Sequence, residues 1–129
     1  MQRFKDLMVW QRSQALAVRV YGLTAPLPRD ERLGITSQIR RAIVSVPANI
    51  AEGSKRESNA DFGRFLNIAE GSLAESESLL LLASGLGYLT HDSLELCAAE
   101  MAQIGKMLHS LRMKVVASRR QPRQSFDNK

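Results

Sequence analysis

The 129 residues suit one domain with a single substantial core and are short for two. The side chains are 44% hydrophobic but only 5% aromatic, which favours helices packed through aliphatic side chains. No stretch approaches the ~20 consecutive apolar residues of a membrane span, and the charge-interrupted N-terminus MQRFKDLMVWQRS lacks the apolar run of a signal peptide. The single Cys97 cannot form an internal disulfide, so we expect a cytoplasmic protein without a membrane partner.

The net charge of +5 is unevenly distributed along the chain. Residues 1–29 hold five basic and one acidic residue, and residues 30–60 hold five and four. Residues 61–100 hold one basic and seven acidic residues, whereas residues 101–129 hold seven basic and one acidic residue. Such segregation either binds a polyanion or makes the acidic face of one subunit attract the basic face of another. Composition leaves both interpretations open.

The first predicted helix covers residues 7–25, with Asp6 as its N-cap. Trp10 and Tyr21 lie on one line of this helix. They could stack on nucleic-acid bases, but aromatic residues at helical spacing more often belong to a core or an interface. The segment APLPRDE then ends the helix, because prolines two residues apart cannot continue it.

The second predicted helix runs from about residue 30 to between residues 51 and 54, and it carries an apolar face beside a polar ladder. The ladder consists of Gln38, Arg41, Ser45, Asn49, Glu52 and Arg56. Pro47 in the middle removes one helical hydrogen bond, normally at a cost of ~3 kcal/mol, and should bend the helix. The ladder is either a solvated surface with intrahelical ion pairs or a contact with a neighbouring subunit.

The third predicted helix covers residues 59–85, with Ser58 as its N-cap and Asp61 completing a capping pair. Its first stripe is Phe62, Leu66, Ala69, Leu73, Ser76, Leu80 and Ala83, and its second is Phe65, Ile68, Ser72, Glu75, Leu79, Leu82 and Leu86. One stripe suffices in an isolated bundle, so the second indicates deep burial or an oligomer interface. Glu75 within an apolar line needs a partner, and Arg41 is the candidate. The preceding Lys55 and Arg56 read more readily as a solvated turn than as a phosphate contact.

The fourth predicted helix begins near Thr90 and Asp92 and has a regular three-four apolar seam. The seam consists of Leu94, Cys97, Met101, Ile104, Leu108, Leu111 and Val115. The position of Cys97 on this seam favours an inert buried thiol over a nucleophile. Periodicity ends near Ser118, which predicts one domain over residues 1–118 and a basic, disordered tail over residues 119–129.

A family resemblance rests on three segments: FKDLMVWQRSQALAVRVYGLT, PRDERLGITSQIRRAIVSVPANIAEGSKRES and FGRFLNIAEGSLAESESLL. They resemble the four-helix-bundle proteins of the 23S rRNA-intervening-sequence family over residues 4–89, and the long SVPANIAEG block is the most specific part. The resemblance extends to accessory proteins of diversity-generating retroelements, which bind a reverse transcriptase and nucleic acid. It implies a four-helix bundle and a ring of five subunits. Leu33 departs from the pattern, because an aromatic residue is often expected there.

No catalytic or metal-binding pattern is recognisable in the sequence. A di-iron bundle needs Glu-x-x-His motifs, and neither His91 nor His109 has a glutamate three residues before it. There is no zinc-ligand spacing, no phosphate-binding glycine loop and no Gly-x-Ser-x-Gly motif. Glu70, Glu75 and Glu77 share one helix, but carboxylates without a pocket are weak signs of acid-base catalysis. We therefore expect no enzyme, no cofactor and no metal.

The sequence thus predicts an all-α, antiparallel up-down-up-down four-helix bundle that assembles into a ring-like homo-oligomer, a pentamer if the resemblance holds. The first functional hypothesis is a non-enzymatic scaffold that associates with nucleic acid, RNA in preference to DNA, through basic surfaces. Its candidate binding residues are Arg3, Lys5, Arg12, Arg19, Lys114, Arg119, Arg120 and Arg123. The alternative is a protein-protein adaptor whose charge segregation serves self-assembly and a protein partner. Gln38, Arg41, Ser45, Asn49, Glu52 and Glu75 are predicted to form a buried or inter-subunit polar network.

Overall fold

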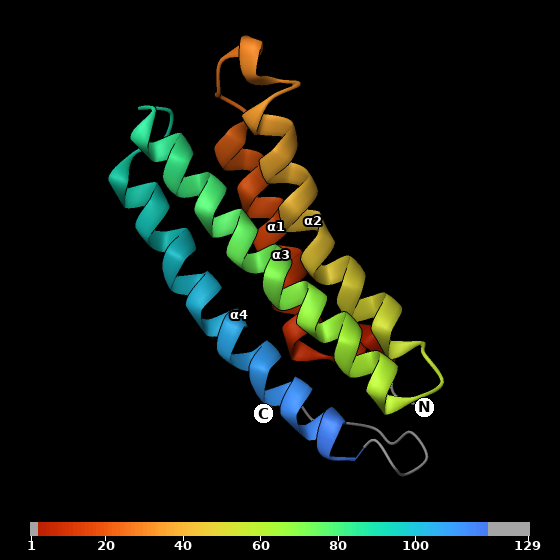
Figure 1. Ribbon diagram of the computed structural model, residues 1–129. Helices are drawn as coiled ribbons and strands as arrows, with labels where there is room; N and C mark the ends of the chain where they lie inside the picture. The colour runs from red at the N-terminus through yellow and green to blue at the C-terminus, as the bar shows by residue number, and fades with distance from the viewer. Residues whose placement is uncertain (1–2, 119–129) are drawn as a thin grey trace.

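The computed structural model describes residues 3–118 (Figure 1). Its helices are α1 (Met8–Thr24), α2 (Ile35–Ser54), α3 (Asn59–Gly85) and α4 (His91–Ala117), with short 3₁₀ helices η1 (Phe4–Asp6) and η2 (Arg29–Glu31). No strand occurs among the described residues. The prediction of an all-α chain with four helices is confirmed. The predicted tail, with Arg119, Arg120 and Arg123, lies outside the described residues.

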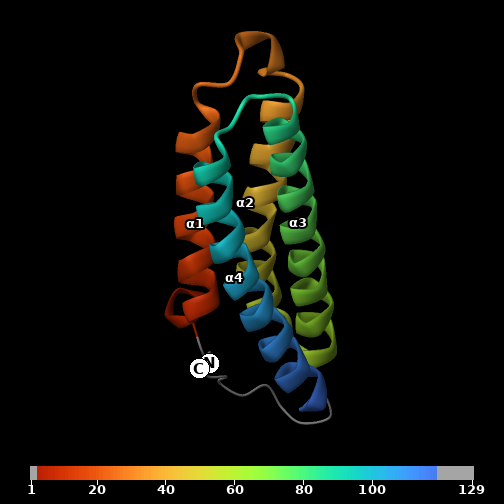
Figure 2. The ribbon, with the colours of Figure 1, turned by 90° about the vertical axis from the view of Figure 1, so that its left-hand side faces the viewer.

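The four α-helices lie side by side in one bundle (Figures 1 and 2). α2 packs against α1 and α3, and α4 packs against α3 and α1. The α1–α2 and α3–α4 connections lie together at one end, where the Tyr88 hydroxyl donates a hydrogen bond of 2.9 Å to Glu31. At the other end, the Asn59 side chain donates to the backbone oxygen of Ser118 at 3.0 Å. The N-terminal η1 and the α2–α3 turn share this second end (Figure 1).

The starts of α3 and α4 agree with the prediction because side chains cap them locally. The Ser58 hydroxyl accepts a hydrogen bond from the backbone N–H of Asp61 at 3.1 Å. The Thr90 hydroxyl accepts one from the N–H of Ser93 at 3.2 Å. Each cap satisfies one of the free N–H groups in the first turn of a helix.

The starts of the first two helices differ from the prediction. Asp6 belongs to η1, and Leu7 takes the N-cap position of α1 without a side-chain hydrogen bond, so Asp6 as the N-cap was wrong. α2 begins at Ile35 because the preceding Gly34 has φ −109° and ψ −118°, outside the helical range. The helix then continues through the buried Pro47.

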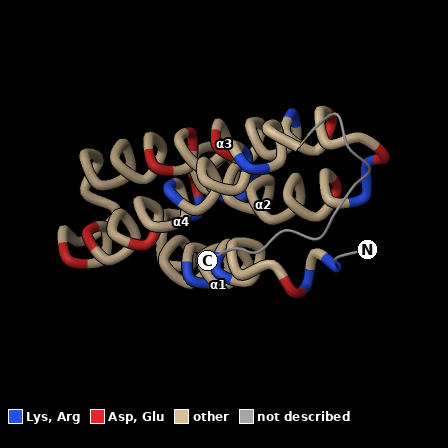
Figure 3. The backbone as a smooth tube through the Cα atoms, turned by 90° about the horizontal axis from the view of Figure 1, so that it is seen from below, with Lys and Arg blue, Asp and Glu red and all other residues tan. Residues whose placement is uncertain are grey.

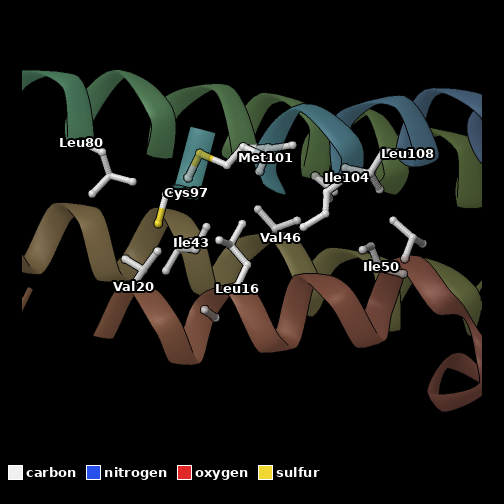
Figure 4. Close-up of a cluster of buried hydrophobic side chains, with 14 of the residues drawn as sticks. Leu16, Val20, Ile43, Val46, Ile50, Leu80, Cys97, Met101, Ile104 and Leu108 are labelled. Atoms are coloured by element: carbon white, nitrogen blue, oxygen red, sulfur yellow. The ribbon is translucent and has the colours of Figure 1, made fainter. Parts of the chain in front are cut away.

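One apolar core runs between the helices, and Figure 4 shows side chains from all four helices directed into it. All seven residues of the first α3 stripe are buried, as are six of the seven seam residues of α4; Leu94 is partly buried. The predicted inward faces of these two helices are therefore confirmed. α2 and α3 approach each other closely at Gly53, where an added Cβ would lie 2.6 Å from the Cβ of Phe65.

Candidate nucleic-acid interface and assembly surface

Basic residues from separate segments gather at the end of the bundle that holds the N-terminus and the α2–α3 turn (Figures 1 and 3). We call this set the basic end; its described members are Arg3, Lys5, Lys55, Arg56, Arg64 and Lys114. Arg3 and Lys5 are exposed beside and within η1, which packs against α2. Lys114 is exposed in the last turns of α4, whose end is tied to the start of α3 by the Asn59 hydrogen bond.

The α2–α3 turn forms an open hollow of about 860 Å³ in the basic end. Lys55, Arg56 and Arg64 are among its lining residues. The guanidinium carbons of Arg56 and Arg64 lie 5.0 and 4.6 Å from the centroid of the Phe65 ring, within the range of cation–π attraction. The ring thus helps to position two cations beside Lys55.

Acidic residues share this turn and offset part of its charge. Arg56 lies 3.5 Å from Glu52, and Arg64 lies 2.9 Å from Asp61. Glu57 lines the same hollow. Within the described residues, Lys55 has no carboxylate within ion-pair distance. Lys55 is therefore the cation of this turn best placed to meet an external anion.

The predicted binding residues Arg12 and Arg19 lie apart from the basic end, on the body of α1. The Nη2 atom of Arg12 lies 2.6 Å from the carboxylate of Glu100 on α4, and its Nε donates to the same oxygen at 2.8 Å. The two side chains are 33% and 31% exposed, so this ion pair is partly shielded from water. Arg12 thus joins α1 to α4, whereas Arg19 is exposed.

Part of the predicted polar network joins α2 to α3. The hydroxyls of Ser45 and Ser72 lie 2.8 Å apart. The Asn49 side chain donates to both the backbone oxygen and the hydroxyl of Ser45, at 2.7 and 2.8 Å. Glu52 lies outside this group and pairs with Arg56.

Gln38, Arg41 and Glu75 line an open hollow of about 510 Å³ next to this serine pair. All three are exposed, and among the described residues no ion pair joins Arg41 to Glu75. Arg41 as the partner of Glu75 within one chain is therefore wrong, because both groups face outward and remain hydrated. A contact of either group with a neighbouring subunit stays a prediction.

The outward face of α2 is unusually poor in charge. Residues 42–51 include no charged residue, although Val44 and Ala48 are exposed there. An apolar groove of about 580 Å³ separates this face from α1. Trp10 and Tyr21 line the groove; Trp10 packs against the core, whereas Tyr21 is exposed and an interface position for it stays a prediction. The guanidinium carbon of Arg40 lies 4.4 Å from the Tyr21 ring centroid.

The second stripe of α3 is only partly covered by the rest of the chain. Phe65 is buried, but Ile68, Leu82 and Leu86 are exposed. Deep burial within the bundle, one of the two explanations for this stripe, is therefore excluded for Ile68, Leu82 and Leu86. The other explanation, an oligomer interface, stays a prediction.

Other chemistry is limited within the described residues. No group of three His, Cys, Asp or Glu side chains is placed to hold a metal ion, and none of the described helices is both long and apolar enough to cross a bilayer. Cys97 is buried, and burial raises the pKa of its thiol. A raised pKa keeps the thiol protonated and therefore weakly nucleophilic.

Comparisons with known proteins agree with the fold. The family model of the 23S rRNA-intervening sequence protein matches residues 5–110. A crystal structure of a protein with unknown function from the S23 ribosomal protein family of Bacteroides thetaiotaomicron superposes with a TM-score of 0.73 and 30% sequence identity. The similarity covers 81% of this chain and 98% of that chain. The comparison with curated proteins gives no match.

Proposed function

The chain belongs to the 23S rRNA-intervening sequence protein family, and we propose that it is a cytoplasmic, non-enzymatic scaffold that associates with nucleic acid, RNA in preference to DNA, through its basic end. We further propose that the bundle is antiparallel, up-down-up-down, and that its copies assemble into a ring-like homo-oligomer. The observation that supports binding is the convergence of basic residues from η1, the α2–α3 turn and α4 at one end.

The mode of binding follows from the exposure of these cations. Exposed lysines and arginines attract phosphates without reading bases, and the affinity of such contacts falls steeply as salt rises. One basic end offers only a few such contacts. Because an oligomer presents several copies of this end to one strand, modest contacts sum to a useful affinity. Arg3, Lys5, Lys55 and Lys114 are the described residues that we assign to this role.

A matched pair of charge reversals tests this proposal. Lys55→Glu changes the basic end, whereas Arg29→Glu makes the same change in the exposed α1–α2 connection at the opposite end. Fluorescence anisotropy with a labelled single-stranded RNA of about 30 nucleotides, measured over a range of salt concentrations, gives affinity and salt slope. We expect Lys55→Glu to weaken binding several-fold and to lower the salt slope by about one unit for each copy in contact with RNA.

Arg29→Glu should leave the RNA affinity and the salt slope near the wild-type values. Equal losses in the two variants would contradict binding at the basic end. Absence of salt-sensitive binding by the wild type would contradict the nucleic-acid function altogether.

The protein-protein adaptor is the second candidate, and the uncharged outward face of α2 favours it. An exposed helix surface without charges over about three turns is typical of a contact surface rather than of a solvated face. In this case the wild type binds no RNA at any salt concentration. Charge reversals then change only the mass of the assembly, which light scattering measures.

A further inference from the structure

We propose that the apolar groove between α1 and α2 binds the exposed edge of α3 from a second copy of the chain, so that copies join head to tail. The groove is lined by Trp10, Val18, Tyr21, Val44 and Ala48, among others. The α3 edge consists of Ile68 and Leu82, together with Leu86 directly after the helix, and we call it the α3 ridge. The contact specifies the surfaces of the assembly proposed above and rests on that proposal.

The groove is an apolar surface that the chain itself leaves uncovered. Val18 is 70% exposed, and Tyr21 and Val44 are each 43% exposed. The groove floor is closed by the small Ala17 and the buried Pro47, so side chains from outside can approach the backbones of α1 and α2. Apolar surface of this extent is a recognised mark of a protein contact.

The α3 ridge and the groove are of similar length. Ile68 and Leu82 lie on one side of α3, and Leu82 is 53% exposed. Ser72, Glu75 and the partly buried Leu79 lie between them on the same stripe. From Ile68 to Leu82 the helix rises about 21 Å, and from Trp10 to Tyr21 it rises about 17 Å, at 1.5 Å per residue. Side chains that project in rows from one helix commonly pack into the grooves on the surface of another helix.

Charge complementarity selects this pairing. Arg32 and Arg40 line a hollow of about 340 Å³ that also includes Tyr21 and Val44 of the groove. Residues 65–86, by contrast, contain no basic residue and three glutamates: Glu70 is paired with Arg112, Glu75 is exposed on the ridge stripe, and Glu77 is exposed elsewhere on α3. Opposite charges across a contact favour the correct pairing and speed association.

The same charges argue against a contact between two identical grooves. A groove-to-groove contact would bring the arginines of both copies together, and like charges across an interface are unfavourable. Among the described helices of one chain, α1 contacts α2 and α4 but not α3, so the α3 ridge does not cover the groove. A head-to-tail contact between the groove of one copy and the ridge of the next covers both surfaces and keeps the arginines apart. Such contacts close into a ring when the rotation between copies permits it.

Three glutamate substitutions at exposed apolar residues test the pairing by light-scattering mass. Val18→Glu alters the groove and Leu82→Glu alters the ridge, whereas Leu96→Glu on α4 touches neither surface and serves as the control. We expect an oligomer for the wild type and for Leu96→Glu, and monomers for the other two. Circular dichroism melting checks that each variant folds; Val44→Glu replaces Val18→Glu if that variant does not.

An equimolar mixture of Val18→Glu and Leu82→Glu distinguishes head-to-tail pairing from other contacts. The first variant keeps an intact ridge and the second an intact groove, so together they form one good contact. We expect a dimer of twice the monomer mass. It should not grow further, because the next contact would join the altered groove of Val18→Glu to the altered ridge of Leu82→Glu and place two glutamates together.

A mixture that stays monomeric overturns the pairing of groove with ridge. A wild-type oligomer that persists in both variants overturns the choice of surfaces and leaves the proposed assembly standing. A monomeric wild type overturns this contact together with the assembly, whereas the anisotropy measurement above judges nucleic-acid binding separately.

Discussion

Replacement of Gly53 by alanine should destabilise the bundle, because α2 and α3 approach each other closely at this residue. An added Cβ would lie 2.6 Å from the Cβ of Phe65 and 3.0 Å from Cδ1 of Phe62. The Cβ of Phe65 is fixed to the α3 backbone, so no side-chain rotation relieves the first contact. The two helices must instead separate by several tenths of an ångström.

The size of the effect follows from two opposing terms. Overpacking of a well-packed core typically costs ~1–3 kcal/mol. Alanine regains at most ~1 kcal/mol of helix propensity relative to glycine, and less at the penultimate residue of α2. The net loss should be about 1–2 kcal/mol, which lowers Tm by roughly 4–8 °C for a chain of this size.

Thermal and urea unfolding followed by circular dichroism, at one fixed protein concentration, measure this loss. Gly22→Ala is the matched control, because an added Cβ there meets nothing within 4 Å and Gly22 is an exposed helical residue of α1. That variant should gain stability, by up to ~1 kcal/mol. A Gly53→Ala protein as stable as the wild type would refute the close-approach reasoning.

Two further predictions concern side chains that connect distant segments. Arg12→Ala should cost about 1–2 kcal/mol in urea unfolding, because it strands the half-buried carboxylate of Glu100, whereas Arg19→Ala should cost almost nothing; equal effects would place Arg12 on open surface instead. The pKa of Tyr88 is raised above 10.0, mainly because its hydroxyl donates a hydrogen bond to Glu31. The folded state therefore holds this proton more tightly, so its contribution to stability is complete below pH 10 and is lost as pH rises through the raised pKa. Stability measured between pH 9 and 11 should fall less steeply in Tyr88→Phe than in the wild type, and identical slopes would count against the Tyr88–Glu31 contact.

Local sequence determined α3 and α4 almost completely. Their N-caps are Ser58 and Thr90, whose partners lie three residues along the chain, and their buried faces repeat every three or four residues. Both signals depend on residues within one helical turn, so they do not depend on how the rest of the chain packs. The same local reasoning failed at Asp6, because η1 and its packing against α2 displaced the start of α1.

The candidate site depended on tertiary structure to a greater degree. The sequence marked Arg3, Lys5 and Lys114 as basic and treated Lys55 as a solvated turn, but only the bundle brings these residues to one end.

The ion pair between Arg12 and Glu100 joins residues 88 positions apart, and the expected pairing of Arg41 with Glu75 does not form within the described chain. Periodicity predicts which face of a helix is polar, whereas the packing of the helices decides which polar groups come into contact. The sequence by itself therefore determined the helices and their inward faces, and the tertiary structure decided the outward surfaces, because these arise from segments that no local interaction connects.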